Sequence, residues 1–185
     1  MVMPVAAEIQ KNIAVPDGVK VDYDTKTGIL TITGPLGTLS RKFMRPNFKF
    51  EYKDNKISFS CKFPRRKDNS LLGTWEGHVK NMVLGVTTGF EYKMKIVYSH
   101  FPIKTHVKDN ELIIENFLGE KQPRRAKMVG ETKVKVSGDQ IVINSIDIEA
   151  AGQSMANIER ATRIKNYDLR VFQDGIYLVE HPKNY

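Results

Sequence analysis

The chain has 185 residues, a formal net charge of +8 and a hydrophobic fraction of 41%. That length permits one domain or two small ones, and the hydrophobic fraction is too high for a disordered chain. An excess of positive charge favours polyanionic partners, of which nucleic acid is the most common and an anionic membrane surface is the other. Composition therefore makes nucleic-acid binding a hypothesis without establishing it.

Cys61 is the only cysteine, so the chain cannot form an internal disulfide. It lies in a strand-like stretch, where a small buried side chain is the simplest interpretation. Residues Met1–Glu8 lack the basic start and long apolar core of a signal peptide, and no apolar run approaches the roughly 20 residues that span a bilayer. We therefore expect a soluble, intracellular protein.

Alternating apolar and polar residues predict a series of strands in the first part of the chain. In chain order, the expected extended segments are Ile9–Val15, Val19–Tyr23, Ile29–Thr33, Thr38–Phe43, Phe48–Tyr52 and Ile57–Cys61. Asp24–Gly28 and Asp54-Asn55 have the composition of turns. Gly34–Gly37 bends the chain and lacks the residue spacing of phosphate-binding loops. Pro64–Lys67 is expected to form a loop.

A helix follows this loop. Its apolar residues recur at three- and four-residue steps, as in one buried stripe: Leu72, Trp75, Val79, Met82, Val83 and Val86. Asp68, Asn69 or Ser70 can cap the start of the helix. Gly85 and Gly89 suit its end.

The same order of elements then repeats. The expected strands are Tyr92–Tyr98, Ile103–Val107, Leu112–Glu115, Thr132–Ser137 and Gln140–Asn144. A turn is expected at Asp109-Asn110, and a second helix carries Ala151, Met155, Ile158 and Thr162 on one face. In the tail, Val171-Phe172 and Ile176–Leu178 bracket Asp174-Gly175, which predicts a final hairpin.

Matching landmarks in the two halves are separated by similar offsets. Gly119 follows Gly37 by 82 residues, Ile141 follows Ile57 by 84, and Gly152 follows Gly73 by 79. A repeat of this length is typical of a duplicated domain rather than a solenoid unit. We therefore predict an α+β protein of two similar tandem domains, residues 1–90 and 91–185. Each domain is expected to be a mostly antiparallel sheet covered by one helix.

Positive residues form three clusters and one addition in the tail: Arg65, Arg66 and Lys67; Arg124, Arg125 and Lys127; Arg160, Arg163 and Lys165; and Arg170. Such clusters are often only solvated surface, and cations at the end of a helix also stabilise its dipole. Residues 1–90 carry a net charge of +6, but residues 91–185 carry only +2. Composition thus leaves open which half binds a polyanion.

The sequence gives little sign of catalysis. The four histidines, His78, His100, His106 and His181, have no metal-ligand spacing, and no pair of carboxylates suggests an acid–base site. We therefore predict neither an enzyme nor a bound cofactor or metal.

Several motifs, taken together, resemble one protein family over essentially the whole chain. They are Gly77–Met82, Gly85–Thr87, Gly89–Lys93, Tyr98–Pro102, Asn116–Lys121, Asn157–Thr162 and Phe172–Tyr177. In this order they resemble large-subunit ribosomal protein six, called protein nine in eukaryotes. The Phe between His100 and Pro102 is typical of archaeal or eukaryotic members, and the ending Arg170–Tyr177 is closer to archaeal ones.

The resemblance implies two similar α+β domains and a structural role in the large ribosomal subunit, in the cytoplasm and without contact with a membrane. It also implies that the second domain binds large-subunit rRNA near the sarcin–ricin loop and the stalk base, beside neighbouring ribosomal proteins and translation factors. By this analogy the rRNA contacts fall on Arg124, Arg125, Lys127, Arg160, Arg163, Lys165 and Arg170, and also on His100 and Lys121, which lie inside the family motifs. The cluster Arg65–Lys67 could add contacts from the first domain.

Two other functions stay open from the sequence. The chain could be a protein-interaction module on the ribosome surface, with its charge serving solubility, and then its binding would survive nuclease treatment. A hydrolase or transferase acting on RNA would need an acid–base or metal site, which the sequence does not show.

Overall fold

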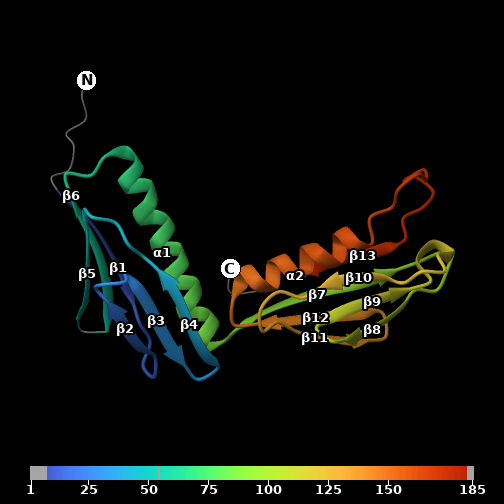
Figure 1. Cartoon of the computed structure of the whole chain (residues 1–185), viewed down its shortest axis with the longest axis horizontal. Coiled ribbons are helices and arrows are strands. Elements are labelled where there is room, and N and C mark those ends of the chain that lie inside the picture. The colour runs from blue at the N-terminus through green and yellow to red at the C-terminus, as the bar shows by residue number, and fades with distance from the viewer. Residues whose placement is uncertain (1–7, 54, 183–185) are drawn as a thin grey trace. The chain divides into compact units, whose positions relative to one another are not determined.

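The computed structural model describes residues 8–53 and 55–182 (Figure 1). The chain divides into two compact units, Met1–Thr88 and Gly89–Tyr185. Each unit contains antiparallel strands and one α-helix, which confirms the predicted α+β class. The prediction about a signal peptide and the centre of the turn at Asp54 fall on residues outside those described.

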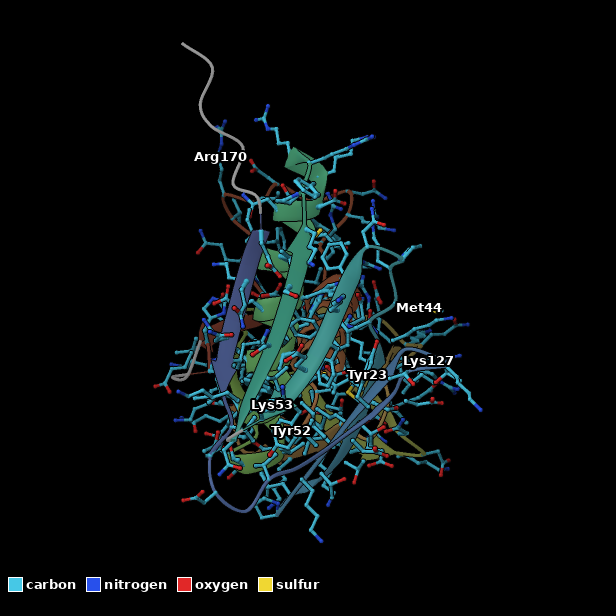
Figure 2. All side chains as sticks on the ribbon, turned by 90° about the vertical axis from the view of Figure 1, so that its left-hand side faces the viewer. Tyr23, Met44, Tyr52, Lys53, Lys127 and Arg170 are labelled. Atoms are coloured by element: carbon cyan, nitrogen blue, oxygen red, sulfur yellow. The ribbon has the colours of Figure 1, made fainter. Side chains whose placement is uncertain are left out.

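The described residues of the first unit form six strands and the helix α1. They are β1 (Glu8–Ala14), β2 (Lys20–Asp24), β3 (Ile29–Gly34), β4 (Gly37–Lys42), β5 (Phe48–Lys53), β6 (Lys56–Lys62) and α1 (Arg66–Thr87). The strands form two antiparallel three-stranded sheets, in the orders β1-β6-β5 and β2-β3-β4. In Figure 2 the sheet β1-β6-β5 faces the viewer, with β6 between the other two strands.

The core of the first unit lies between α1 and the two sheets. Leu72, Val79 and Val86 on α1 are fully buried, as the helical spacing predicted. Trp75 packs against the rings of Phe43, Phe48 and Phe59, with ring centroids 4.8 to 5.5 Å apart. Cys61 is also buried, and this burial raises the pKa of its thiol. The packing interpretation of Cys61 is therefore confirmed.

The predicted start of α1 and the placing of Gly85 at its end need correction, whereas Gly89 is confirmed as the residue of the passage onward. The helix begins at Arg66, before the expected capping residues, because the Asp68 carboxylate reaches back and accepts the backbone N–H of Arg65 at 3.1 Å. The expected loop Pro64–Lys67 is therefore partly helical. At the other end Gly85 lies inside the helix, whereas Gly89 has the positive φ of 72° that suits the residue after a helix.

Residues 89–182, the described part of the second unit, form seven strands, a short 3₁₀ turn and the helix α2. They are β7 (Phe90–Val97), β8 (Lys104–Lys108), β9 (Glu111–Glu115), η1 (Phe117–Gly119), β10 (Arg124–Lys127), β11 (Lys133–Ser137), β12 (Gln140–Ser145), α2 (Ile148–Ala161) and β13 (Gly175–Glu180). The sheets have the orders β10-β9-β8 and β11-β12-β7-β13. Figure 1 shows α2 running along the strands of this unit. Its Ala151 and Ile158 are fully buried.

Local turn chemistry sets the hairpins of the second unit. Asp109 and Asn110 both have positive φ, 49° and 61°, which is the conformation of a two-residue hairpin turn that Asn and Asp tolerate.

The hairpin expected in the tail is wrong. Ile176–Leu178 belongs to β13, which pairs antiparallel with β7, and Val171-Phe172 is not a strand. The edge of β7 offers a full ladder of backbone partners, which a short local hairpin cannot match.

Among residues 8–53 and 55–182, no helix combines the length and the apolar character that are needed to cross a membrane.

Gly34 marks a tight contact between β3 and the end of α1. A Cβ atom on Gly34 would lie 2.7 Å from the Val86 backbone oxygen. Because that oxygen belongs to the backbone of a packed helix, it cannot move easily to relieve the clash. We expect Gly34→Ala to lower the free energy of unfolding of the first unit by about 1–3 kcal/mol. Urea denaturation followed by tryptophan fluorescence measures this, because Trp75 lies in that unit's core.

Gly73→Ala is the matched control. A Cβ at Gly73 meets nothing within 4 Å, and Ala is a better helix former than Gly by about 1 kcal/mol. This variant should be as stable as the parent or more stable. Equal effects of the two substitutions would contradict the tight contact at Gly34.

Candidate nucleic-acid interface

The basic cluster on β10 divides between two faces of its strand. Arg124 and Ala126 point inward, with Ala126 buried, whereas Arg125 and Lys127 are exposed on the other face. Alternation along a strand explains this split. The structure therefore brings Arg125 and Lys127 together and separates Arg124 from them.

Arg124 is held by contacts within the protein. Its Nε and Nη2 donate to the Glu120 carboxylate at 2.8 and 2.6 Å, and its Nη1 donates to the carbonyls of Ala161 and Arg163 at 2.9 and 3.0 Å. The guanidinium also lies 4.3 Å from the centroid of the Phe117 ring. These contacts tie β10 to the C-terminal end of α2, and the hydrogen bonds from Arg124 lower the pKa of Glu120.

The second cluster lies around the end of α2. Arg160 and Arg163 are exposed and line a hollow of about 480 Å³, together with Leu169 and Tyr177. Arg160 stands in the last turn of the helix, where the helix dipole favours a cation. The structure thus places two of the predicted arginines on one concave surface.

The segment 163–174 extends this surface between α2 and β13. Lys165 and Arg170 are exposed, and so are the apolar side chains of Tyr167, Leu169 and Val171. Exposed apolar groups next to cations are typical of a surface that is covered in an assembly. Figure 2 labels Arg170 and, on β10, Lys127.

A buried carboxylate anchors this segment. Asp174 is fully buried, and its two oxygens accept the backbone N–H groups of Ser99 and His100 at 3.1 and 3.3 Å. They also accept the Ser99 hydroxyl at 3.1 Å and lie 3.3 Å from His100 Nδ1. Burial by itself would raise the pKa of Asp174, but the hydrogen bonds from His100 and Ser99 outweigh it and lower the pKa.

His100 makes its contacts within the protein, with Asp174 and Phe172. Its ring stacks on Phe172 with centroids 4.4 Å apart and planes 27° apart, while its side chain keeps about a third of its surface exposed, at 33%. His100 thus joins the turn at 98–102 to the segment 163–174. Lys121 is exposed between η1 and β10.

In the first unit, the cluster Arg65–Lys67 is exposed at the start of α1. Cations in this position oppose the helix dipole, which favours negative charge there. Asp68, which is buried and lies 3.3 Å from Arg45, supplies the compensating charge.

Sequence reasoning missed three basic or titratable side chains beside Arg125 and Lys127. Lys104, His106 and Lys108 alternate on β8 and are exposed. Strand pairing aligns His106 with Ile113 and Arg125, and Lys108 with Glu111 and Lys127, so these residues share the outer face of the sheet β10-β9-β8. The alternation on β8 was visible in the sequence, but only the register shows which strand lies beside it.

Within the described part of the chain, no group of three or more His, Cys, Asp or Glu side chains is placed to hold a metal ion.

The contacts of Arg124 predict a structural effect of its removal. Arg124→Ala should lower the free energy of unfolding of the second unit by about 2 kcal/mol, because a charged hydrogen-bond network is lost and two carbonyls lose their donor. Urea unfolding of the full chain checks this. Arg125→Ala, on the exposed face of the same strand, should change stability by less than about 0.5 kcal/mol. A comparable loss in both variants would contradict the assigned role of Arg124.

The lowered pKa of Asp174 predicts a dependence of stability on pH. A carboxyl whose pKa is lower in the folded state stabilises that state above its ordinary pKa of about 4, and the contribution is lost as pH falls through the folded-state pKa. Asp174→Asn should therefore reduce the drop in unfolding free energy between about pH 6 and about pH 3. Urea titrations at both values measure it. Asp139→Asn, in an exposed turn, should leave the drop unchanged; equal drops in the parent and Asp174→Asn would refute the anchor.

Comparison with known proteins agrees with this architecture. The chain matches the family Ribosomal protein L6 over residues 15–89 and 101–175. It is 49% identical to large ribosomal subunit protein uL6 of Methanobrevibacter smithii, over 96% of this chain and 98% of that protein. It is 46% identical to the protein of the same name from Methanosarcina mazei, over 94% of this chain and 97% of that protein, and 46% identical to that of Archaeoglobus fulgidus, over 94% and 90%. With two matched repeats and near-complete coverage, this chain belongs to the ribosomal protein L6 family.

Proposed function

We propose that this chain is a structural protein of the large ribosomal subunit whose second unit binds large-subunit rRNA. Membership of the ribosomal protein L6 family, with relatives named as large-subunit proteins rather than enzymes, supports the structural role. By its resemblance to the family, the rRNA contact lies near the factor-binding region, with the sarcin–ricin loop and the stalk base. Neighbouring ribosomal proteins and, close by, translation factors complete the proposed surroundings.

The observation that carries the rRNA proposal is the concave surface at the end of α2. Arg160 and Arg163 line its hollow, and Lys165 and Arg170 extend from the segment that borders it. Arginine presents a planar set of donors that matches two oxygens of one phosphate. A concave surface bearing such donors suits the convex backbone of a folded RNA.

The proposal assigns two roles to the predicted residues. Arg160, Arg163, Lys165 and Arg170 form one phosphate-binding surface, and Arg125 and Lys127 form another on the sheet β10-β9-β8. Arg124 and His100 position these surfaces, since their donors bind Glu120, backbone carbonyls and Asp174. Lys121 and the cluster Arg65–Lys67 are proposed as peripheral contacts.

Recognition by these surfaces depends on shape more than on base sequence. A-form RNA hides its base edges in a deep and narrow major groove and displays phosphates and 2′-hydroxyls. Cations fixed on strands and a helix end can match such a pattern with little loss of conformational entropy on binding. Counterions released from the RNA then supply much of the binding free energy.

Salt dependence tests the proposal quantitatively. For an rRNA fragment that contains the sarcin–ricin loop, affinity of the full chain should fall steeply from about 50 to about 200 mM salt. Replacing Arg160, Arg163 and Lys165 together with Ala should weaken binding and reduce the slope of log K against log salt by about three. Fluorescence anisotropy at several salt concentrations measures both quantities.

A matched triple variant provides the control. Replacing Lys20, Lys26 and Lys56 in the first unit with Ala removes the same charge from exposed positions outside every predicted contact. Its slope should stay near that of the parent. Equal losses in both triple variants would mean that only net charge matters. A salt-independent affinity, or binding to large-subunit particles that survives nuclease digestion, would favour the protein-interaction module instead.

A further inference from the structure

The two units differ at one edge of their corresponding sheets. In the second unit the order is β11-β12-β7-β13, and in the first unit it is β5-β6-β1. Strands β5, β6 and β1 therefore match β11, β12 and β7, whereas no described strand of the first unit matches β13. The outer edge of β1 is the position that β13 covers in the other copy.

Individual contacts support this correspondence. Val15 donates its N–H to the carbonyl of Asn55 at 2.8 Å, and Ile96 donates to Asp139 at 2.7 Å, in the same place of each sheet. Ile57 and Ile141, which occupy equivalent positions in the two units, are both fully buried. The same holds for Val79 on α1 and Ile158 on α2. Residues Asn12–Val15 thus match Lys93–Ile96, the part of β7 that pairs with β13.

The backbone of β1 presents donors and acceptors at this edge. Because Val15 bonds toward β6, and successive residues of a strand direct their N–H and C=O groups to opposite sides, Gln10, Asn12 and Ala14 direct theirs outward. All three residues are exposed. Pro16, which has no N–H, limits the edge at its far end.

The usual protection against strand addition is weak along this stretch. Sheet edges are normally guarded by charged side chains, bulges or prolines. Lys11 is the one charged residue between Gln10 and Ala14, and it bonds to Glu76 of α1 at 3.1 Å rather than guarding the edge. The register of β1 with β6 is regular from Glu8 to Ala14, without a bulge.

The helix above the edge leaves room for a further strand. Ala156 and Glu159 of α2 border β13, and Glu159 accepts the N–H of Leu178 at 3.3 Å. The matching residues of α1 are Gly77 and Lys80, and a Cβ at Gly77 would meet nothing within 4 Å. Space that side chains fill in the second unit is thus open in the first.

Charge indicates what kind of strand fits. Lys11 and Lys80 share the single carboxylate of Glu76, at 3.1 and 2.8 Å, so these three side chains together carry a net charge of +1. In the second unit the corresponding α2 residue is Glu159, so the polarity is reversed. An acidic side chain on the incoming strand would complement the pair of lysines.

We propose that the outer edge of β1 binds an extended segment of a neighbouring ribosomal protein. The segment adds as an antiparallel strand in the place that β13 takes in the second unit. Its apolar residues alternate and face α1, as Ile176 and Leu178 of β13 face α2, and an acidic residue lies near Lys80. The proposal rests on the chain's place in the large subunit and not on the rRNA contacts of the second unit.

Site-specific photocrosslinking in purified large subunits tests this arrangement. A benzophenone amino acid replaces Gln10 in one full-length variant and Ala14 in another, and both side chains would reach the residue opposite on an added strand. Both variants should crosslink to the same protein. In an antiparallel strand the residue reached from position 10 lies about four positions C-terminal to the residue reached from position 14. Mass spectrometry of the crosslinked peptides reads this spacing.

A proline provides a second test of the edge. Asn12→Pro removes an outward N–H and no backbone bond of β1 to β6, although it also removes the hydrogen bond that Asn12 Oδ1 accepts from the Ser58 hydroxyl at 2.9 Å. It should reduce the crosslink from position 14 roughly tenfold. Ser40→Pro is the matched control on β4, where the N–H of Phe43 bonds inward to Gly28 and that of Ser40 therefore points outward. It should leave the crosslink unchanged. Thermal melts show whether both proline variants fold. The spacing between the crosslinks from positions 10 and 14 is measured without either proline, so it tests the proposal even if a proline variant does not fold.

Every other outcome overturns the proposal. Crosslinks to rRNA, to a second copy or to another segment of this chain would identify a different occupant. Contacts without the antiparallel spacing would exclude strand addition, and the lack of any protein crosslink from both positions would exclude a partner. The rRNA-binding measurements on the second unit are made separately, so failure of either proposal can be recognised without the other.

Discussion

The candidate surface of the second unit depends on two polar anchors, Arg124 and Asp174. Arg124 joins β10 to the carbonyls at the end of α2, and Asp174 joins the start of β13 to the turn at 98–102. Each anchor satisfies several hydrogen-bonding groups at once, so loss of either would leave donors or acceptors unpaired. They fix the ends of the segment that carries Lys165 and Arg170.

This rigidity matters because the proposed chemistry is only electrostatic. A cation on a mobile loop loses conformational entropy when it binds a phosphate, whereas a cation on an anchored element loses less. The stacked rings of His100 and Phe172 add to the same support. Arg124, from the cluster Arg124, Arg125 and Lys127, is by its contacts an anchor that holds its neighbours in place.

The two repeated units differ at one edge of their corresponding sheets. In the second unit β13 completes the sheet beside β7, and the segment that leads to it forms the concave surface. In the first unit the matching edge of β1 has no described strand, and its helix carries Gly77 and Lys80 where α2 has Ala156 and Glu159. One scaffold would thus present the proposed RNA-binding surface in one copy and the proposed strand-accepting edge in the other.

The sequence alone determined the α+β class, both helices and most strands, because apolar spacing and turn residues act locally. It also identified the family, through motifs such as Asn116–Lys121 that are retained in order. Only the tertiary structure decided that Arg124 faces inward while Arg125 and Lys127 face outward, and that β13 pairs with β7 rather than folding into a local hairpin. These outcomes depend on strand register and on which edges are open, and both are set by contacts between residues far apart in the chain.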